Sequence, residues 1–109
     1  MAYPKDELPP PERAREDPQA FELLRLWFAG EAPALSARLD LWPDPAAWGV
    51  MLGEIATEIA RQVAEMGDVD RDAALMRIRA GWAAEMEARD GARELDESPW
   101  GLRHPPGQE

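Results

Sequence analysis

Three aspartates spaced two residues apart are the nearest approach to a metal-binding motif in this chain. Asp68, Asp70 and Asp72 match the first three ligands of a calcium loop. Counted from Asp68, the sixth position is Ala73, where the loop requires glycine, and the twelfth is Arg79, where it requires a bidentate glutamate. Acidic residues also favour the N-terminus of a helix, because they complement its dipole. We therefore expect helix capping here and predict no metal site.

Groups suited to acid–base or nucleophilic catalysis are few and scattered. The sequence has one histidine, His104, and two serines, Ser36 and Ser98, neither of which lies in a nucleophile-elbow pattern. It has no cysteine, which excludes thiol chemistry and cysteine-bound metals. Glu54 and Glu58 lie one helical turn apart, but such pairs are common on solvated helices, and a catalytic carboxylate requires a partly dry cleft. We expect no catalytic residue and no cofactor, which argues against an enzyme without excluding one.

Tryptophan is the unusual residue of this chain, with five copies in 109 residues. Trp48 and Trp82 fall on predicted apolar helical stripes, so we expect them in the core. Trp27 and Trp42 are freer to act at a surface, where tryptophan is enriched among binding hot spots. Together with Arg38 they would join aromatic walls to a cation that selects an anion. We therefore predict an interface or pocket formed by Trp27, Arg38 and Trp42.

The first predicted element of secondary structure is a β-hairpin over about 21–41. Residues 34–41 alternate apolar and polar side chains, which is typical of a strand with one solvated face. Residues 21–28, FELLRLWF, supply its mate, with Gly30 and Pro33 as turn residues. The alternative is a helix over residues 18–29, which would make the chain all-α.

Two amphipathic helices are predicted after the hairpin. Asp44 is a good N-cap, Pro45 fits the first helical position, and Gly67 is a natural stop. Apolar residues recur at helical spacing over about 45–66 and again over 70–90. The short connection predicts antiparallel packing. The predicted fold class is therefore α+β, a β-hairpin followed by an antiparallel α-hairpin.

Composition divides the chain into one folded body and two tails. Residues 1–19 contain five prolines among charges and predict a flexible arm. Residues 20–91 form the predicted globular domain. Residues 92–109 are charged and proline-containing, so we expect a mostly irregular tail.

The formal net charge of −10 limits the classes of partner. No segment is basic, so we expect binding neither to nucleic acid nor to anionic membrane surfaces. No run approaches the ~20 apolar residues of a membrane-spanning helix. The N-terminus also lacks the basic start and apolar core of a signal peptide, which predicts a cytoplasmic protein.

The run ELLRLW, followed by a short alternating strand and WPDPAAWGVMLGEIATEIARQVA, resembles a family of short bacterial proteins. That family is known as a domain of unknown function and is associated with alphaproteobacteria. The similarity covers roughly residues 21–90, and its most specific part is Asp44 to Gly49 after a strand. The resemblance supports the fold and implies no activity.

A two-stranded sheet is marginal in water and exposes two edges. Because the first strand is also apolar on both faces, a second copy is the simplest way to cover it. We therefore predict a small homodimeric protein–protein interaction module or regulator without catalysis, whose arms can reach a protein partner. The alternative is a binder of a small anionic ligand, or an enzyme, with its pocket at the dimer interface.

Overall fold

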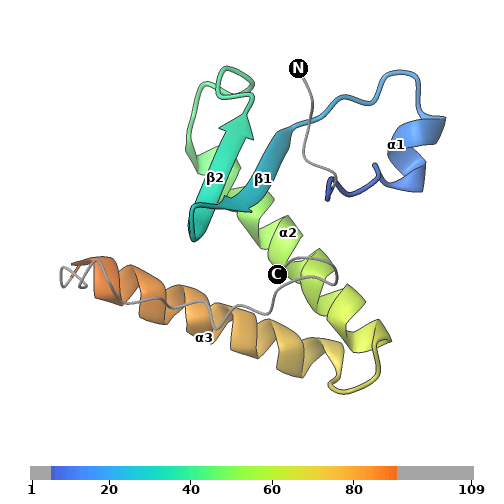
Figure 1. Cartoon of the computed structure of the whole chain (residues 1–109). Helices are drawn as coiled ribbons and strands as arrows, with labels where there is room; N and C mark the ends of the chain where they lie inside the picture. Colours follow the sequence, from blue (N-terminus) through green and yellow to red (C-terminus); the bar gives the residue numbers. More distant parts are fainter. Residues whose placement is uncertain (1–5, 91–109) are drawn as a thin grey trace. The chain divides into compact units, whose positions relative to one another are not determined.

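The computed structural model describes residues 6–90 and contains three helices and two strands in that range. Their order is α1 (Glu12–Glu16), β1 (Leu24–Ala29), β2 (Ala32–Ala37), α2 (Ala46–Glu65) and α3 (Arg71–Asp90) (Figure 1). The chain divides after Pro43 into two compact units, described separately below. The predicted α+β class is confirmed, and the all-α alternative is wrong because part of residues 18–29 forms a strand.

The first unit contains an antiparallel hairpin closed by a two-residue turn. Leu24 pairs with Ala37 at the open end, and Ala29 pairs with Ala32 beside the turn. Gly30 and Glu31 both have positive φ, 61° and 64°. Positive φ at both central residues is the requirement of a type I′ turn, whose twist matches that of the strands.

The hairpin differs from the prediction in the residues of its turn and in the end of its second strand. Pro33 is not a turn residue: it lies in β2 opposite Phe28. A proline is tolerated there because β2 is an edge strand. β2 also ends at Ala37, although the alternation runs to Leu41, because the Leu41 N–H turns back to the carbonyl of Arg38 at 3.3 Å.

The two long helices begin and end where the sequence predicts. An Asp44 carboxylate oxygen accepts from the Ala46 N–H at 2.9 Å, and Pro45 already has helical dihedral angles. After α2, Gly67 has a φ of 99° and its N–H donates to the Ala64 carbonyl at 3.0 Å. Asp70 then accepts from the Ala73 N–H at 2.8 Å. Of the three closely spaced aspartates, Asp70 is therefore the one that caps α3.

The helices α2 and α3 contact each other, and the residues that they bury are small. Ala60 on α2 is completely buried and Ala74 on α3 nearly so, and within residues 6–90 no other apolar residue is buried. From this contact near the connecting turn, the two helices diverge (Figure 1). Trp82, farther along α3, keeps 55% of its surface exposed. The expectation that Trp82 is a core residue is therefore wrong for the single chain.

The N-terminal arm contains one element that the sequence did not suggest. The single-turn helix α1 lies within the proline-rich arm predicted over residues 1–19. Residues 1–5 and the predicted tail at 92–109 lie outside the described residues.

Candidate interaction surface

One face of the β-hairpin is apolar throughout. Cross-strand partners lie on the same face and alternate residues share it. The register therefore gathers six residues, which we call the apolar hairpin face: Leu24, Leu26, Phe28, Pro33, Leu35 and Ala37. At its centre Leu26 and Leu35 lie opposite each other, exposed to 62% and 63%. Such a face is a candidate binding surface because its central leucines remain in solvent.

The hydrogen-bond pattern explains why these six side chains crowd together. In a hairpin with a two-residue turn, the pair beside the turn is hydrogen-bonded, and pairs then alternate. Counting from Ala29–Ala32, the pair Leu26–Leu35 is non-hydrogen-bonded. The Arg38 N–H to Leu23 carbonyl bond, at 3.1 Å, agrees with this count. Non-hydrogen-bonded pairs bring their side chains closest, so the face presents nearly continuous hydrocarbon.

The opposite face of the hairpin carries a charged clamp. Arg25 lies in β1 and contacts Glu7 of the arm at 2.7 Å and Glu22 at 3.0 Å. Its side chain is only one-third exposed, whereas most ion pairs here are more open. The guanidinium thus ties the arm before α1 to the hairpin, across 18 residues of sequence.

Arg38 closes the open end of the hairpin. Its Nε donates to the Glu22 carbonyl at 2.8 Å, and its guanidinium lies 5.4 Å from the centre of the Phe21 ring. A cation over an aromatic face at this distance is attracted by the ring. The arginine predicted to select an anion therefore already contacts groups of its own chain.

The three residues predicted to form an interface or pocket occupy different places in the first unit. Trp27 lies in β1 opposite Ala34 and is half-buried on the face that bears Arg25. Arg38 directly follows β2, and Trp42 lies half-buried in the segment after the hairpin. Whether the three residues share a site stays a prediction.

The sequence reasoning missed the apolar hairpin face as a unit. It expected one solvated face in the second strand, on the side of Ser36, but Leu35 on the other side is 63% exposed as well. The signal was available in FELLRLWF, where Leu24, Leu26 and Phe28 are all apolar at period two. Because Pro33 was assigned to the turn, the prediction did not include it in this face.

In the second unit, each long helix bears apolar residues outside the alanine contact. Leu52, Ile59 and Met66 recur at intervals of seven along α2 and its C-terminus, and all three are exposed. Trp82 and Met86, four residues apart on α3, are also exposed. Apolar residues that recur every seven positions lie on the side along which a helix packs against other helices. These helical stripes are therefore a second apolar surface.

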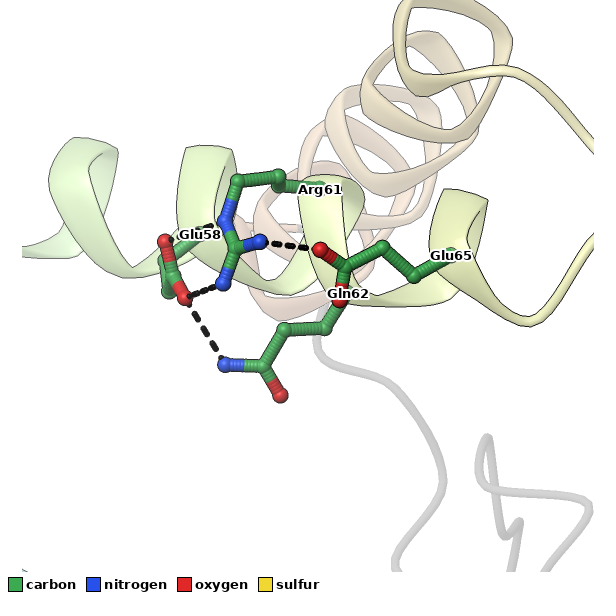
Figure 2. A network of polar contacts seen from close by, with 4 residues as sticks. All are labelled: Glu58, Arg61, Gln62 and Glu65. Atoms are coloured by element: carbon green, nitrogen blue, oxygen red, sulfur yellow. Dashed lines mark hydrogen bonds and ion pairs between the residues drawn. The ribbon is translucent and has the colours of Figure 1, made fainter. Parts of the chain in front are cut away.

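A polar network covers a different side of α2 (Figure 2). Arg61 contacts both Glu58 and Glu65, and the Gln62 amide donates to Glu58 at 2.8 Å. The hydrogen bonds from Arg61 and Gln62 lower the pKa of Glu58 from 4.5 to about 2, and the two glutamates raise the pKa of Arg61. The side chains of Glu58, Arg61 and Glu65 are about half-exposed or more, so the network lies on a solvated helix face and has no dry cleft around it.

No group of three or more potential ligands suited to a metal ion occurs in residues 6–90. Of the three aspartates resembling a calcium loop, Asp70 caps α3 and Asp72 contacts Arg71 at 3.0 Å. His104 and Ser98 lie outside the described residues. None of the helices in the described part is long and apolar enough to cross a membrane.

Comparisons with known proteins agree with this description of the fold. Residues 7–90 match the family model described as "Domain of unknown function (DUF5076)". A search of curated proteins gives no match. Among solved structures, the chain is similar to one described as a "putative pyruvate dehydrogenase from the photosynthetic bacterium Rhodopseudomonas palustrus CGA009". The identity is 30%, the TM-score 0.54, and the alignment covers 80% of this chain and 99% of that one.

Proposed function

The chain belongs to the DUF5076 family, a domain of unknown function, and we propose that it is a homodimeric protein–protein interaction module without catalysis of its own. The observation that carries this proposal is the exposed Leu26–Leu35 pair at the centre of a six-residue apolar face. Soluble monomers rarely expose contiguous apolar patches beyond a few hundred Å². A second copy is the partner that is always present with such a surface.

The balance of buried and exposed residues supports the same proposal. Within the described chain, the buried apolar residues are two alanines, whereas leucine, methionine and tryptophan side chains lie in solvent. Burial of large apolar side chains is the main source of folding free energy, at about 1.5–3 kcal/mol for each. A chain that buries few of them alone gains stability by burying more against a partner.

The charge suggests which partners the dimer meets. With a net charge of −10 on each copy, the dimer favours a protein partner and disfavours nucleic acid and anionic membranes. We place it in the cytoplasm as a small regulator or adaptor. The N-terminal arm and the residues beyond 90 are the segments we propose for contact with the further partner.

Molar mass in solution tests the dimer directly. Light scattering on a sizing column at micromolar concentration should give twice the chain mass of 12.2 kDa. Dilution should then lower the mean mass, because a dimer dissociates by mass action. A constant mass of 12.2 kDa over the same range would contradict the proposal.

A second candidate function is suggested by the name of the similar structure. Pyruvate is a small carboxylate, which fits the predicted alternative of an anionic ligand, or an enzyme acting on one, at the dimer interface. Against this candidate, Arg25 and Arg38 already contact Glu7, Glu22 and Phe21.

Thermal unfolding in millimolar pyruvate tests this candidate, with acetate at equal ionic strength as the control. A bound ligand stabilises by mass action, so binding would raise the midpoint in pyruvate alone. We expect equal midpoints in the two anions, and a rise specific to pyruvate would favour the ligand-binding function.

A further inference from the structure

We infer that the apolar hairpin face is the centre of the dimer interface, with the same face of a second copy stacked on it about a two-fold axis. This inference rests on the proposed homodimer and names the surface that forms it. Stacked sheets pack their side chains face to face, as in a β-sandwich, with about 10 Å between the backbones.

Charge favours this face for contact between two identical chains. Each copy carries a net charge of −10, so the copies repel one another unless they meet on neutral surface. The six residues of the apolar hairpin face include no charged side chain. The charged clamp of Arg25, Glu7 and Glu22 involves the other side of β1. Stacking by the apolar face therefore places no like charges directly opposite each other.

The face is also complementary to itself. A two-fold interface brings the same patch of both copies together, so the patch must be complementary to itself, and residues near the axis meet their own copies. Leu26 and Leu35 lie side by side at the centre, with Phe28–Pro33 on one flank and Leu24–Ala37 on the other. When a second copy is rotated about the two-fold axis onto this face, the leucine pairs of the two copies meet at the centre. This holds for either direction of the strands of the second copy.

Pairing through the outer edge of β2 is less favourable than stacking. Phe28–Pro33 is a non-hydrogen-bonded pair by the alternation described above, so the nitrogen of Pro33 faces the outer edge. Proline has no N–H, and a strand added at this edge would lose a hydrogen bond at that position. The same proline adds apolar surface to the face. Its placement thus disfavours pairing at the outer edge of β2 and adds to the surface available for stacking.

The face is the centre of the interface and not its whole extent. Stable dimers bury about 800 Å² on each partner, contributed by roughly 20–30 residues. Six residues are fewer than this number, so surrounding surface must also be covered. Hot-spot residues cluster near the centre of an interface, so substitutions of the central leucine pair should weaken the dimer more than substitutions at its rim.

Single-cysteine cross-linking of the full chain tests the assignment cleanly, because the sequence has no cysteine. Stacked backbones lie too far apart for a direct disulfide, so the probe is a short bismaleimide. Leu26→Cys and Leu35→Cys should form covalent dimers at least about tenfold faster than Ala34→Cys and Ser36→Cys, because proximity raises the effective concentration. The control positions alternate with Leu35 on the same strand and face the other way. Equal rates at all four positions would overturn the assignment.

Further variants separate failure of the face from failure of the dimer. Ile59→Cys and Trp82→Cys report on the helical stripes in the same assay. A dimeric mass with cross-links only at these two positions would overturn the hairpin face and leave the dimer standing. A monomeric mass would defeat both. Leu35→Glu should lower the mean mass toward 12.2 kDa, whereas Ser36→Glu should not, with circular dichroism showing that both variants remain folded. A dimeric Leu35→Glu would count against the face.

Discussion

The two units of this chain differ in where their charged and apolar side chains lie. In the helical unit, small apolar residues lie inside the helix contact, and the Glu58–Arg61–Glu65 network lies on a solvated side. In the hairpin unit, the ion pairs of an arginine lie on one side, and exposed leucines lie on the other side. The helical unit thus buries small residues within the chain, although its helical stripes stay exposed. None of the described residues of the hairpin unit is buried, and its apolar face stays open.

The difference follows from the kind of interaction that each unit needs. A helix satisfies its backbone locally, and alanines allow two helices to approach closely. A two-stranded hairpin satisfies only half of its backbone edges and has no second layer of its own. A chain that contains an incomplete hairpin as well as a capped helical pair is what we expect of a protein that assembles with a partner.

Enlarging Ala60 should break the helical unit most strongly. Ala60→Leu adds volume at a site with no exposed surface and should lower the free energy of unfolding by about 1–3 kcal/mol. Ala84→Leu, on an exposed position of α3, is the matched control and should change stability by less than about 0.5 kcal/mol. Urea denaturation measures both. Equal effects would show that the alanine contact does not limit helix packing.

Removing the cap of α3 should have the next largest effect. Asp70→Ala leaves the Ala73 N–H without its acceptor and should cost about 1 kcal/mol. Asp68→Ala removes an equal charge two residues earlier and should cost less. Urea denaturation of the two variants side by side separates the cap from the charge. A larger loss for Asp68→Ala would contradict the assignment of the cap.

The turn of the hairpin should respond in opposite directions at its two positions. Gly30→Ala forces an L-residue to a φ of 61° and should destabilise the hairpin by about 1 kcal/mol. Glu31→Gly relieves the same strain at a φ of 64° and should stabilise it by up to about 1 kcal/mol. Nothing lies within 4 Å of a Cβ built on Gly30, so the loss reports the backbone alone. Amide exchange of β1 and β2 measures both, and changes of the same sign would exclude a type I′ turn.

The smallest effect should come from the solvated network. The pKa of Glu58 is lowered from 4.5 to about 2, so its carboxylate favours the folded state. That contribution is complete above pH 4.5 and is lost as the pH falls toward 2. Carbon-13 NMR titration should find the lowered pKa, and Arg61→Gln should return it toward 4.5. A normal pKa in the unmodified protein would show that the network does not persist in solution.

The limits of the helices could be predicted because their signals are local. Asp44, Pro45 and Gly67 act on backbone groups one to three residues away, and each does what its type favours. Pro33 was placed wrongly for a related reason: proline indicates turns more often than edge strands, and its role depends on the strand opposite.

The candidate surface was harder to predict because it depends on distant residues. Arg25 and Glu7 are 18 residues apart, and no spacing rule connects them. Trp82 carries the periodicity of a core residue yet lies exposed, since periodicity shows which side of a helix is apolar and not what covers it. The family was identified from WPDPAAWG and its surroundings, and its link to alphaproteobacteria stays a prediction.

The contact between Arg25 and Glu7 has a practical consequence for fragment design. A fragment cut at the predicted domain start near residue 20 would remove Glu7 and α1, leaving Arg25 with Glu22. The family match begins at residue 7, which is the arm residue that Arg25 holds. Expression fragments, fusion tags and protease sites should therefore be placed before this residue, because the hairpin recruits its first ion-pair partner well upstream of its first strand.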